Sequence, residues 1–221
     1  MPSFIYIALS VLPIGQTVNP AAKYSNFVLP GIIAMTIMQG GIYGLAYWMV
    51  DMKSRGVIKR FLVTPLKVWQ LILSLVSSRL VVILVQVTVL TLLGVLAFDA
   101  IFAGNFISVL ILVLLGGSIF LLLGLFISNF ANSYEAAAPI TSAIGLPLTF
   151  LGSIFYPIEI LPDTLQTIAQ FLPITYLADG LREAYLHPLN AELIVKDILG
   201  LTVWLILMLV LVISVFKLKE D

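Results

Sequence analysis

Five long apolar stretches, four of them free of charge and one with Arg79 as its single charge, constrain this 221-residue chain more than any other feature. Each is long enough to cross a bilayer, for which about 20 residues in a helix suffice. The predicted spans cover residues 27–50, 75–98, 106–130, 136–158 and 198–216. Only 10% of the residues are charged, against about 25% in an ordinary soluble domain. The sequence therefore predicts an all-α membrane protein, with a single transmembrane domain over residues 1–221, and excludes a soluble globular fold.

Composition also excludes several classes of function. The 11 basic and 11 acidic residues cancel, so the chain lacks the positive charge expected of a nucleic-acid binder. It has no Cys and one His, which rules out disulfides, thiolate metal sites and Cys nucleophiles. No P-loop motif is present, so ATP and Mg²⁺ are expected on another chain and no cofactor on this one. His187 has no hydrolase or metalloprotease motif beside it and is expected to be a surface residue, so no catalytic or metal-binding residue is predicted.

The distribution of basic residues predicts the orientation. The loop between the first two spans holds five basic residues and one acidic residue, and the positive-inside rule makes it cytoplasmic. Following the chain from there puts residues 159–197 and the N-terminus outside and the C-terminus inside the cell membrane. Arg79 falls in the first turns of the second span, where its long side chain can reach the headgroups. The apolar run 4–12 is too short to cross, and we expect either the tail of a span missing from this chain or a short outer arm.

The cytoplasmic loop over residues 51–65 has the pattern of a short amphipathic helix. Apolar and basic side chains fall on opposite sides of a helical wheel, Gly56 allows close approach and Pro65 ends the helix. One interpretation is a loop that merely obeys the positive-inside rule. The other is a docking element for a cytoplasmic partner, formed by Asp51, Lys53, Arg55, Gly56, Lys59, Arg60, Phe61 and Pro65.

Two short helices are predicted outside the membrane, over about residues 162–186. Apolar positions at helical spacing precede Pro173, and a second run with Tyr176 and Arg182 follows it. Neither helix is long enough to span. The pair is interpreted as a re-entrant hairpin that dips into the outer leaflet, or alternatively as two amphipathic helices at the interface.

Proline and glycine mark two of the spans. Pro139 and Pro147 interrupt the hydrogen-bond ladder of the fourth span, which should kink or break, and a bent span can line a pathway. Both residues are also common in membrane helices without any such role. Gly40 and Gly44 form a G-x-x-x-G in the first span, a weak motif that is typical of close helix packing or of a dimer face.

Four ordered motifs resemble one known family, the permease subunits of ABC-2 type ABC transporters, particularly half-size multidrug-type exporters. The motifs are Phe27-Val-Leu-Pro-Gly-Ile-Ile-Ala-Met, Arg55-Gly-Val-Ile-Lys-Arg-Phe-Leu-Val-Thr-Pro65, Tyr156-Pro-Ile-Glu-Ile-Leu-Pro162 and Phe171-Leu-Pro-Ile-Thr-Tyr-Leu-Ala-Asp-Gly-Leu-Arg182. The resemblance starts at about Tyr24, so the five spans correspond to the family's second to sixth. The family's first span and its N-terminal interface helix are expected to be missing here.

The resemblance implies a transport subunit rather than an enzyme. It implies a homodimer or heterodimer of permeases in membrane lipid, docked on two cytoplasmic ATPase subunits through a coupling helix at Asp51–Pro65. It also implies that the first and fourth spans line the pathway at the dimer interface, for a drug-like or lipidic substrate. The outer gate would comprise Pro157, Leu161, Pro162, Pro173, Tyr176 and Arg182.

Two other functions remain open at this point. A non-transporting membrane scaffold or inactive paralogue would bind partners without stimulating ATP hydrolysis. An intramembrane enzyme is the weaker alternative, because Arg79, Asp99 and Glu135 all lie near span ends and no charged side chain is predicted at the middle of a span.

Overall fold

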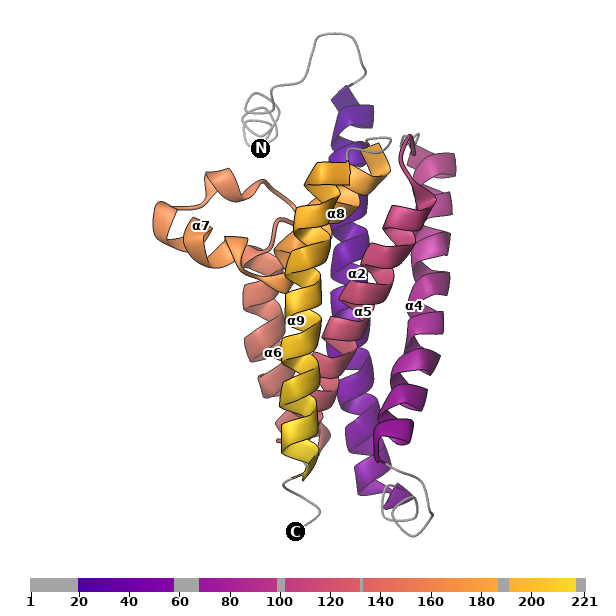
Figure 1. Ribbon diagram of the computed structural model, residues 1–221, viewed down its shortest axis with the longest axis vertical. Coiled ribbons are helices and arrows are strands. Elements are labelled where there is room, and N and C mark those ends of the chain that lie inside the picture. The colour runs from indigo at the N-terminus through magenta and orange to yellow at the C-terminus, as the bar shows by residue number, and fades with distance from the viewer. Residues whose placement is uncertain (1–19, 58–67, 99–101, 132, 187–190, 218–221) are drawn as a thin grey trace.

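The fold of the chain is seen in a computed structural model that describes residues 20–57, 68–98, 102–131, 133–186 and 191–217. These ranges form seven α-helices and one 3-10 turn, with no strand among them (Figure 1). The elements are α2 (Pro20–Ser54), α4 (Val68–Phe98), α5 (Phe106–Ser128), α6 (Tyr134–Leu151), η1 (Ile158–Ile160), α7 (Asp163–Gln170), α8 (Pro173–Leu186) and α9 (Ala191–Lys217). The all-helical class predicted from the sequence is confirmed for the described residues.

Four of these helices are long and apolar enough to cross a membrane. They are Asn26–Ser54 in α2, Ile72–Leu96 in α4, Phe106–Ser128 in α5 and Ile194–Val215 in α9. These correspond to the predicted spans at residues 27–50, 75–98, 106–130 and 198–216. The long helices run side by side along the molecule (Figure 1).

The fourth predicted span, residues 136–158, is shorter in the structure. Helix α6 has 18 residues and ends at Leu151, followed by Gly152 in an extended conformation. Pro139 and Pro147 both lie inside it, and each removes one backbone donor from the ladder. Continuation of the helix to Ile158 is therefore wrong, and residues 152–157 form a non-helical segment before η1.

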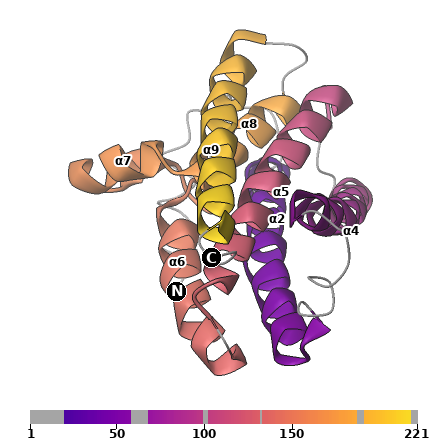
Figure 2. The same cartoon turned by 60° about the horizontal axis from the view of Figure 1, so that its bottom comes forward.

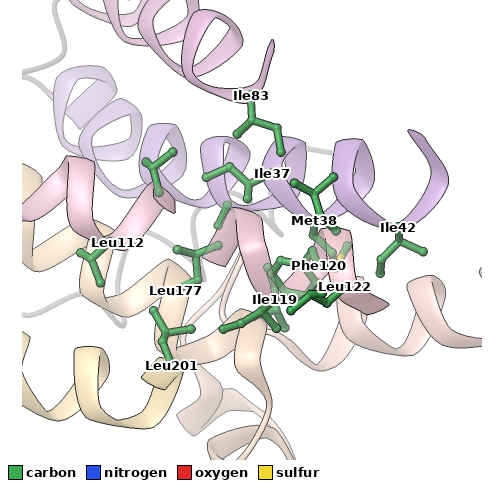
Figure 3. Packing of buried hydrophobic residues seen from close by; sticks show 14 of the residues in the cluster. Ile37, Met38, Ile42, Ile83, Leu112, Ile119, Phe120, Leu122, Leu177 and Leu201 are labelled. Carbon is green, nitrogen blue, oxygen red and sulfur yellow. The ribbon is translucent and has the colours of Figure 1, made fainter. Parts of the chain in front are cut away.

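The centre of the bundle is the crossing of α2 and α5. Half of the apolar window of each of these helices is buried, against 17% for α4 and α9, which flank them. Ile37 and Met38 from α2 belong to the same buried cluster as Ile119 and Phe120 from α5 (Figure 3). The backbones approach so closely that a Cβ on Gly124 would lie 2.5 Å from the Gly41 carbonyl oxygen. Gly41 and Gly124 are therefore the small residues that allow this crossing.

The two short helices predicted to lie outside the membrane, α7 and α8, differ in their surroundings. α8 packs among α2, α5 and α9 and is largely buried, with Leu177 inserted against Gly116 of α5. α7 projects sideways from the bundle, as Figures 1 and 2 both show. Only Ala169 of α7 is buried. The outer pair thus consists of one helix built into the core and one at its periphery.

Candidate functional site

The side chain of Arg182, on α8, connects three separate segments. Only 8% of this residue is exposed. Its guanidinium donates to the Ser153 hydroxyl at 2.6 Å, to the Ile154 carbonyl at 3.0 Å and to the Ser153 carbonyl. It also donates to the Phe27 carbonyl of α2 at 3.3 Å and lies 3.9 Å from the Phe27 ring centroid. We call these contacts, together with Asp179, the arginine clamp.

Two features allow the contacts of the arginine clamp to form. Asp179, one turn before Arg182 on α8, accepts from its guanidinium at 2.7 Å and balances the buried charge. Gly31 lets α2 approach the non-helical segment, because a Cβ there would lie 2.1 Å from the Ile154 carbonyl oxygen. Of these residues, the sequence predicted only Arg182 as part of the outer gate. A glycine directly after a proline inside a span, as in Pro30-Gly31, was the signal that could have pointed to Gly31.

The turn between α7 and α8 lies deep beside α9. The Trp204 indole of α9 donates to the Phe171 carbonyl at 2.9 Å, and the Thr175 hydroxyl donates to the Ala169 carbonyl at 2.6 Å. Trp204 is 13 residues after Ala191, which puts the turn about 20 Å along α9 from its start. Carbonyl groups at that depth need protein donors, and here they have them.

From this turn α8 rises back to the end of the bundle where α5 begins. The amides of Ala103 and Asn105, just before α5, donate to the carbonyls of Tyr185 and Ala184, both at 3.1 Å. Of the other predicted gate residues, Pro173 begins α8 and Tyr176 packs on Gly200 of α9. The deep position of the α7–α8 turn and the return of α8 to the start of α5 favour the re-entrant interpretation over a surface pair. Pro157 and Leu161 flank η1 and Pro162 precedes α7, so the arginine clamp does not include them.

One side of α2 is left open between α4 and α6. We call Gln39, Gly40, Tyr43, Gly44 and Tyr47 the open α2 face. A Cβ on Gly44 would meet no atom within 4 Å, so the G-x-x-x-G is not used at Gly44 for packing among the described residues. Gly40 faces α4, where a Cβ would lie 3.7 Å from the Gln86 side-chain oxygen.

Aromatic side chains join the open α2 face to α6. Tyr47 stacks between Tyr43 and Tyr134, with centroid distances of 6.2 and 5.5 Å. The hydroxyls of Tyr47 and Thr141 lie 3.3 Å apart, and the Tyr43 hydroxyl lies where a Cβ on Gly145 would be 2.4 Å away. Pro139 and Pro147 are on the exposed side of α6. The sequence pointed to Gly40 and Gly44 but not to the tyrosines, whose positions depend on α6.

At the other end of α2, the predicted docking element begins as part of that helix. Helix α2 continues to Ser54, so the prediction of a separate helix that starts at Asp51 is wrong. The helix ends just before Gly56, which adopts φ +66°, a left-handed conformation that glycine accommodates. Asp51 pairs with Arg55 at 3.0 Å, and the Lys53 ammonium donates to the Ser128 carbonyl at the end of α5. The predicted coupling residues Lys59, Arg60, Phe61 and Pro65 lie outside the described residues.

The polar groups of the described residues gather at the arginine clamp and at the open α2 face. Among the described residues, no group of three or more His, Asp or Glu side chains is placed to hold a metal ion. The arginine clamp holds its charge against backbone oxygens, and the open α2 face presents small and polar groups. The chemistry visible in these ranges is therefore that of binding and packing.

Comparison with known proteins gives a consistent result. The family model described as ABC-2 family transporter protein matches residues 4–215. The probable multidrug ABC transporter permease YbhR of Escherichia coli K12 is 25% identical over 185 residues, which cover 84% of this chain and 50% of YbhR. The inner membrane transport permease YadH of the same strain is 26% identical over 74% of this chain and 64% of its own length. The putative transport permease YvfS of Bacillus subtilis is 26% identical over 80% of this chain and 72% of its own. The chain thus spans about half the length of YbhR.

Proposed function

Because this chain belongs to the ABC-2 family of transporter proteins, we propose that it is the membrane permease of an exporter driven by separate ATPase subunits. The proposed location is the inner, or cell, membrane, with Gly56 and the C-terminus on the cytoplasmic side. Relatives named as permeases support the role, and the word multidrug in the name of YbhR favours a drug-like or lipidic substrate. The observation that carries the proposal is the open α2 face, which presents polar and small residues at the middle of a span.

Polar side chains near the middle of a span indicate that protein or water covers the open α2 face. Gln39 is 13 residues into the span Asn26–Ser54, and Gln86 is 14 residues into Ile72–Leu96, so both lie near the middle. Both are exposed, and neither side chain makes a hydrogen bond with another described residue. Exposure of such groups to lipid is costly, whereas a second permease or a water-filled pathway satisfies them. We assign this face to both roles: a second subunit packs on Gly40 and Gly44, and the substrate passes along α2 and α6 at the interface between the two subunits.

Helix α2 is suited to transmit movement between the two ends of the permease. It has 35 residues and is therefore about 50 Å long. Its cytoplasmic end carries the Asp51–Arg55 pair and Gly56, where the ATPase would dock, and its outer part carries Phe27 in the arginine clamp. When ATP draws the ATPase subunits together, they bind one permease state more tightly than the other. This preference shifts the cytoplasmic end of α2. Because α2 is continuous, the movement reaches the arginine clamp and opens the outer side.

The ATPase dependence can be tested at Gly56. The tagged chain would be extracted gently from its native membrane, and the co-purifying ATPase identified and assayed for stimulation and for substrate export. Gly56→Pro forces φ to about −65°, incompatible with the left-handed turn, and should abolish stimulation and export at normal expression. Gly56→Asn is the matched control, because asparagine tolerates the left-handed conformation, and should retain both.

Two results would contradict the proposal. If Gly56→Pro retains both stimulation and export, residues 51–56 do not couple the chain to an ATPase. If a longer relative retains its ATPase under the same extraction and this chain retains none, a non-transporting scaffold becomes the better explanation. Charge reversal of Arg55, Lys59 and Arg60 should release the ATPase if the basic loop holds it.

A further inference from the structure

Arg79, on α4, is a half-buried cation at the inner end of the bundle. It is seven residues after Ile72, where the α4 span begins, so its Cα lies about 10 Å inside that end. Its guanidinium carbon lies 5.2 Å from the ring centroid of Trp48 on α2, and Trp48 is six residues before Ser54. Both helices therefore place the pair at the same depth, near the cytoplasmic end.

The Arg79 guanidinium has no anionic partner among the described residues. Its contact there is the face of the Trp48 ring, which accepts a cation but no in-plane N–H bond. Asp51, the nearest acidic residue in the sequence of α2, is paired with Arg55. The sequence of residues 58–67 contains no Asp or Glu. A cation at this depth with five N–H donors calls for an anion, which none of the described residues supplies.

The surroundings of Arg79 fit an anionic phospholipid of the inner leaflet. Lys53 adds positive charge at the same end of the bundle, where Arg55 is already balanced by Asp51, and this charge attracts negatively charged headgroups. From Arg79 outward, one side of α4 is exposed and apolar along its length. Its exposed side chains include Val82, Val85, Val89 and Leu96. An acyl chain can lie along this row while the headgroup reaches Arg79.

We propose that Arg79 and Trp48 form a binding site for the phosphate of an anionic phospholipid, whose acyl chain lies along α4. Arg79 donates to the phosphate oxygens in the plane of its guanidinium, and the Trp48 ring covers one face of that plane. The site is separate from the open α2 face. Its test measures lipid binding rather than transport, so its failure would leave the proposed function standing.

The test is native mass spectrometry of the purified chain, with any partner that co-purifies, in the presence of defined lipids. The probes are phosphatidylglycerol, phosphatidylcholine and inorganic phosphate. The wild type should retain phosphatidylglycerol in preference to phosphatidylcholine, and excess inorganic phosphate should not displace it. Arg79→Gln should bind phosphatidylglycerol about fivefold more weakly, the change expected when one basic group near a membrane surface is lost.

Two further variants serve as controls. Lys196→Gln removes one positive charge at the opposite end of the bundle and should bind phosphatidylglycerol as the wild type does. Arg79→Lys keeps the charge and should recover part of the affinity. Unchanged phosphatidylglycerol binding by Arg79→Gln, equal retention of the two lipids or displacement by inorganic phosphate would each overturn the proposal. Loss of a permease dimer in Arg79→Gln with lipid binding intact would assign Arg79 to a second subunit instead and also overturn it.

Discussion

The buried Arg182 side chain donates hydrogen bonds to backbone carbonyls. Residues 152–157 leave the helix inside the bundle, so their carbonyls lack the partners that a helix supplies. A planar guanidinium with five donors can satisfy Ser153, Ile154 and Phe27 together while Asp179 balances its charge. One side chain thus replaces several missing helical hydrogen bonds.

Replacing Arg182 should destabilise the protein strongly. Arg182→Met leaves Asp179 without its cation and removes the donor to the Ser153 and Ile154 carbonyls, which should cost about 3–5 kcal/mol, seen as a large fall in melting temperature in detergent. Arg182→Lys should fall between this variant and the wild type, because an ammonium reaches fewer of the acceptors. Arg55→Gln is the control: its pair with Asp51 is exposed and should contribute no more than about 1 kcal/mol. Equal melting temperatures for all variants would contradict a structural role for the arginine clamp.

Helices α2 and α5 form the central pair, and the other helices pack around them. Two glycines at the crossing bring backbone against backbone: a Cβ on Gly41 would lie 2.6 Å from Phe120 Cβ, and one on Gly124 within 2.8 Å of the Ile42 carbonyl oxygen. Backbone atoms cannot move aside as a flexible side chain can. The crossing is therefore intolerant of even one added methyl group.

Alanine substitutions distinguish the crossing from the open α2 face. Gly124→Ala should force α2 and α5 apart and lower stability by about 1–3 kcal/mol, as overpacking in a core does. Gly44→Ala adds the same methyl group where the chain has open space and should leave the stability of the isolated subunit unchanged or slightly higher. Melting temperatures of detergent-solubilised monomer measure both. A larger loss from Gly44→Ala than from Gly124→Ala would show that the two faces have been assigned the wrong way round.

For the whole molecule, the main question is what covers the open α2 face. The described part of the subunit buries the other side of α2 in its core and leaves Gly40, Gly44 and two tyrosines between α4 and α6. Small residues at this position allow the close approach of another helix. A second copy of the chain is therefore expected to cover this face.

Disulfide cross-linking in native membranes can detect that pair, because the chain has no cysteine of its own. Gly44→Cys should give a covalent dimer under mild oxidation if a second copy covers the face. Ile206→Cys, on α9 and 58% exposed, is the control and should remain monomeric. No dimer with Gly44→Cys, or as much with Ile206→Cys, would argue against a homodimer across this face.

The sequence by itself determined the features that depend on local chemistry. Apolar length predicted the helices at the four long spans, and the motifs predicted the ABC-2 family, but Pro139 and Pro147 did not locate the end of α6 at Leu151, because the helix continues through both prolines. Tertiary structure decided the rest. It selected Gly41 and Gly124 for the crossing, and it joined Arg182 to Ile154 and Phe27, which are 28 and 155 residues away in sequence. Hydropathy and proline act over a few residues, whereas a hydrogen-bond partner from another helix depends on which faces meet when the bundle packs.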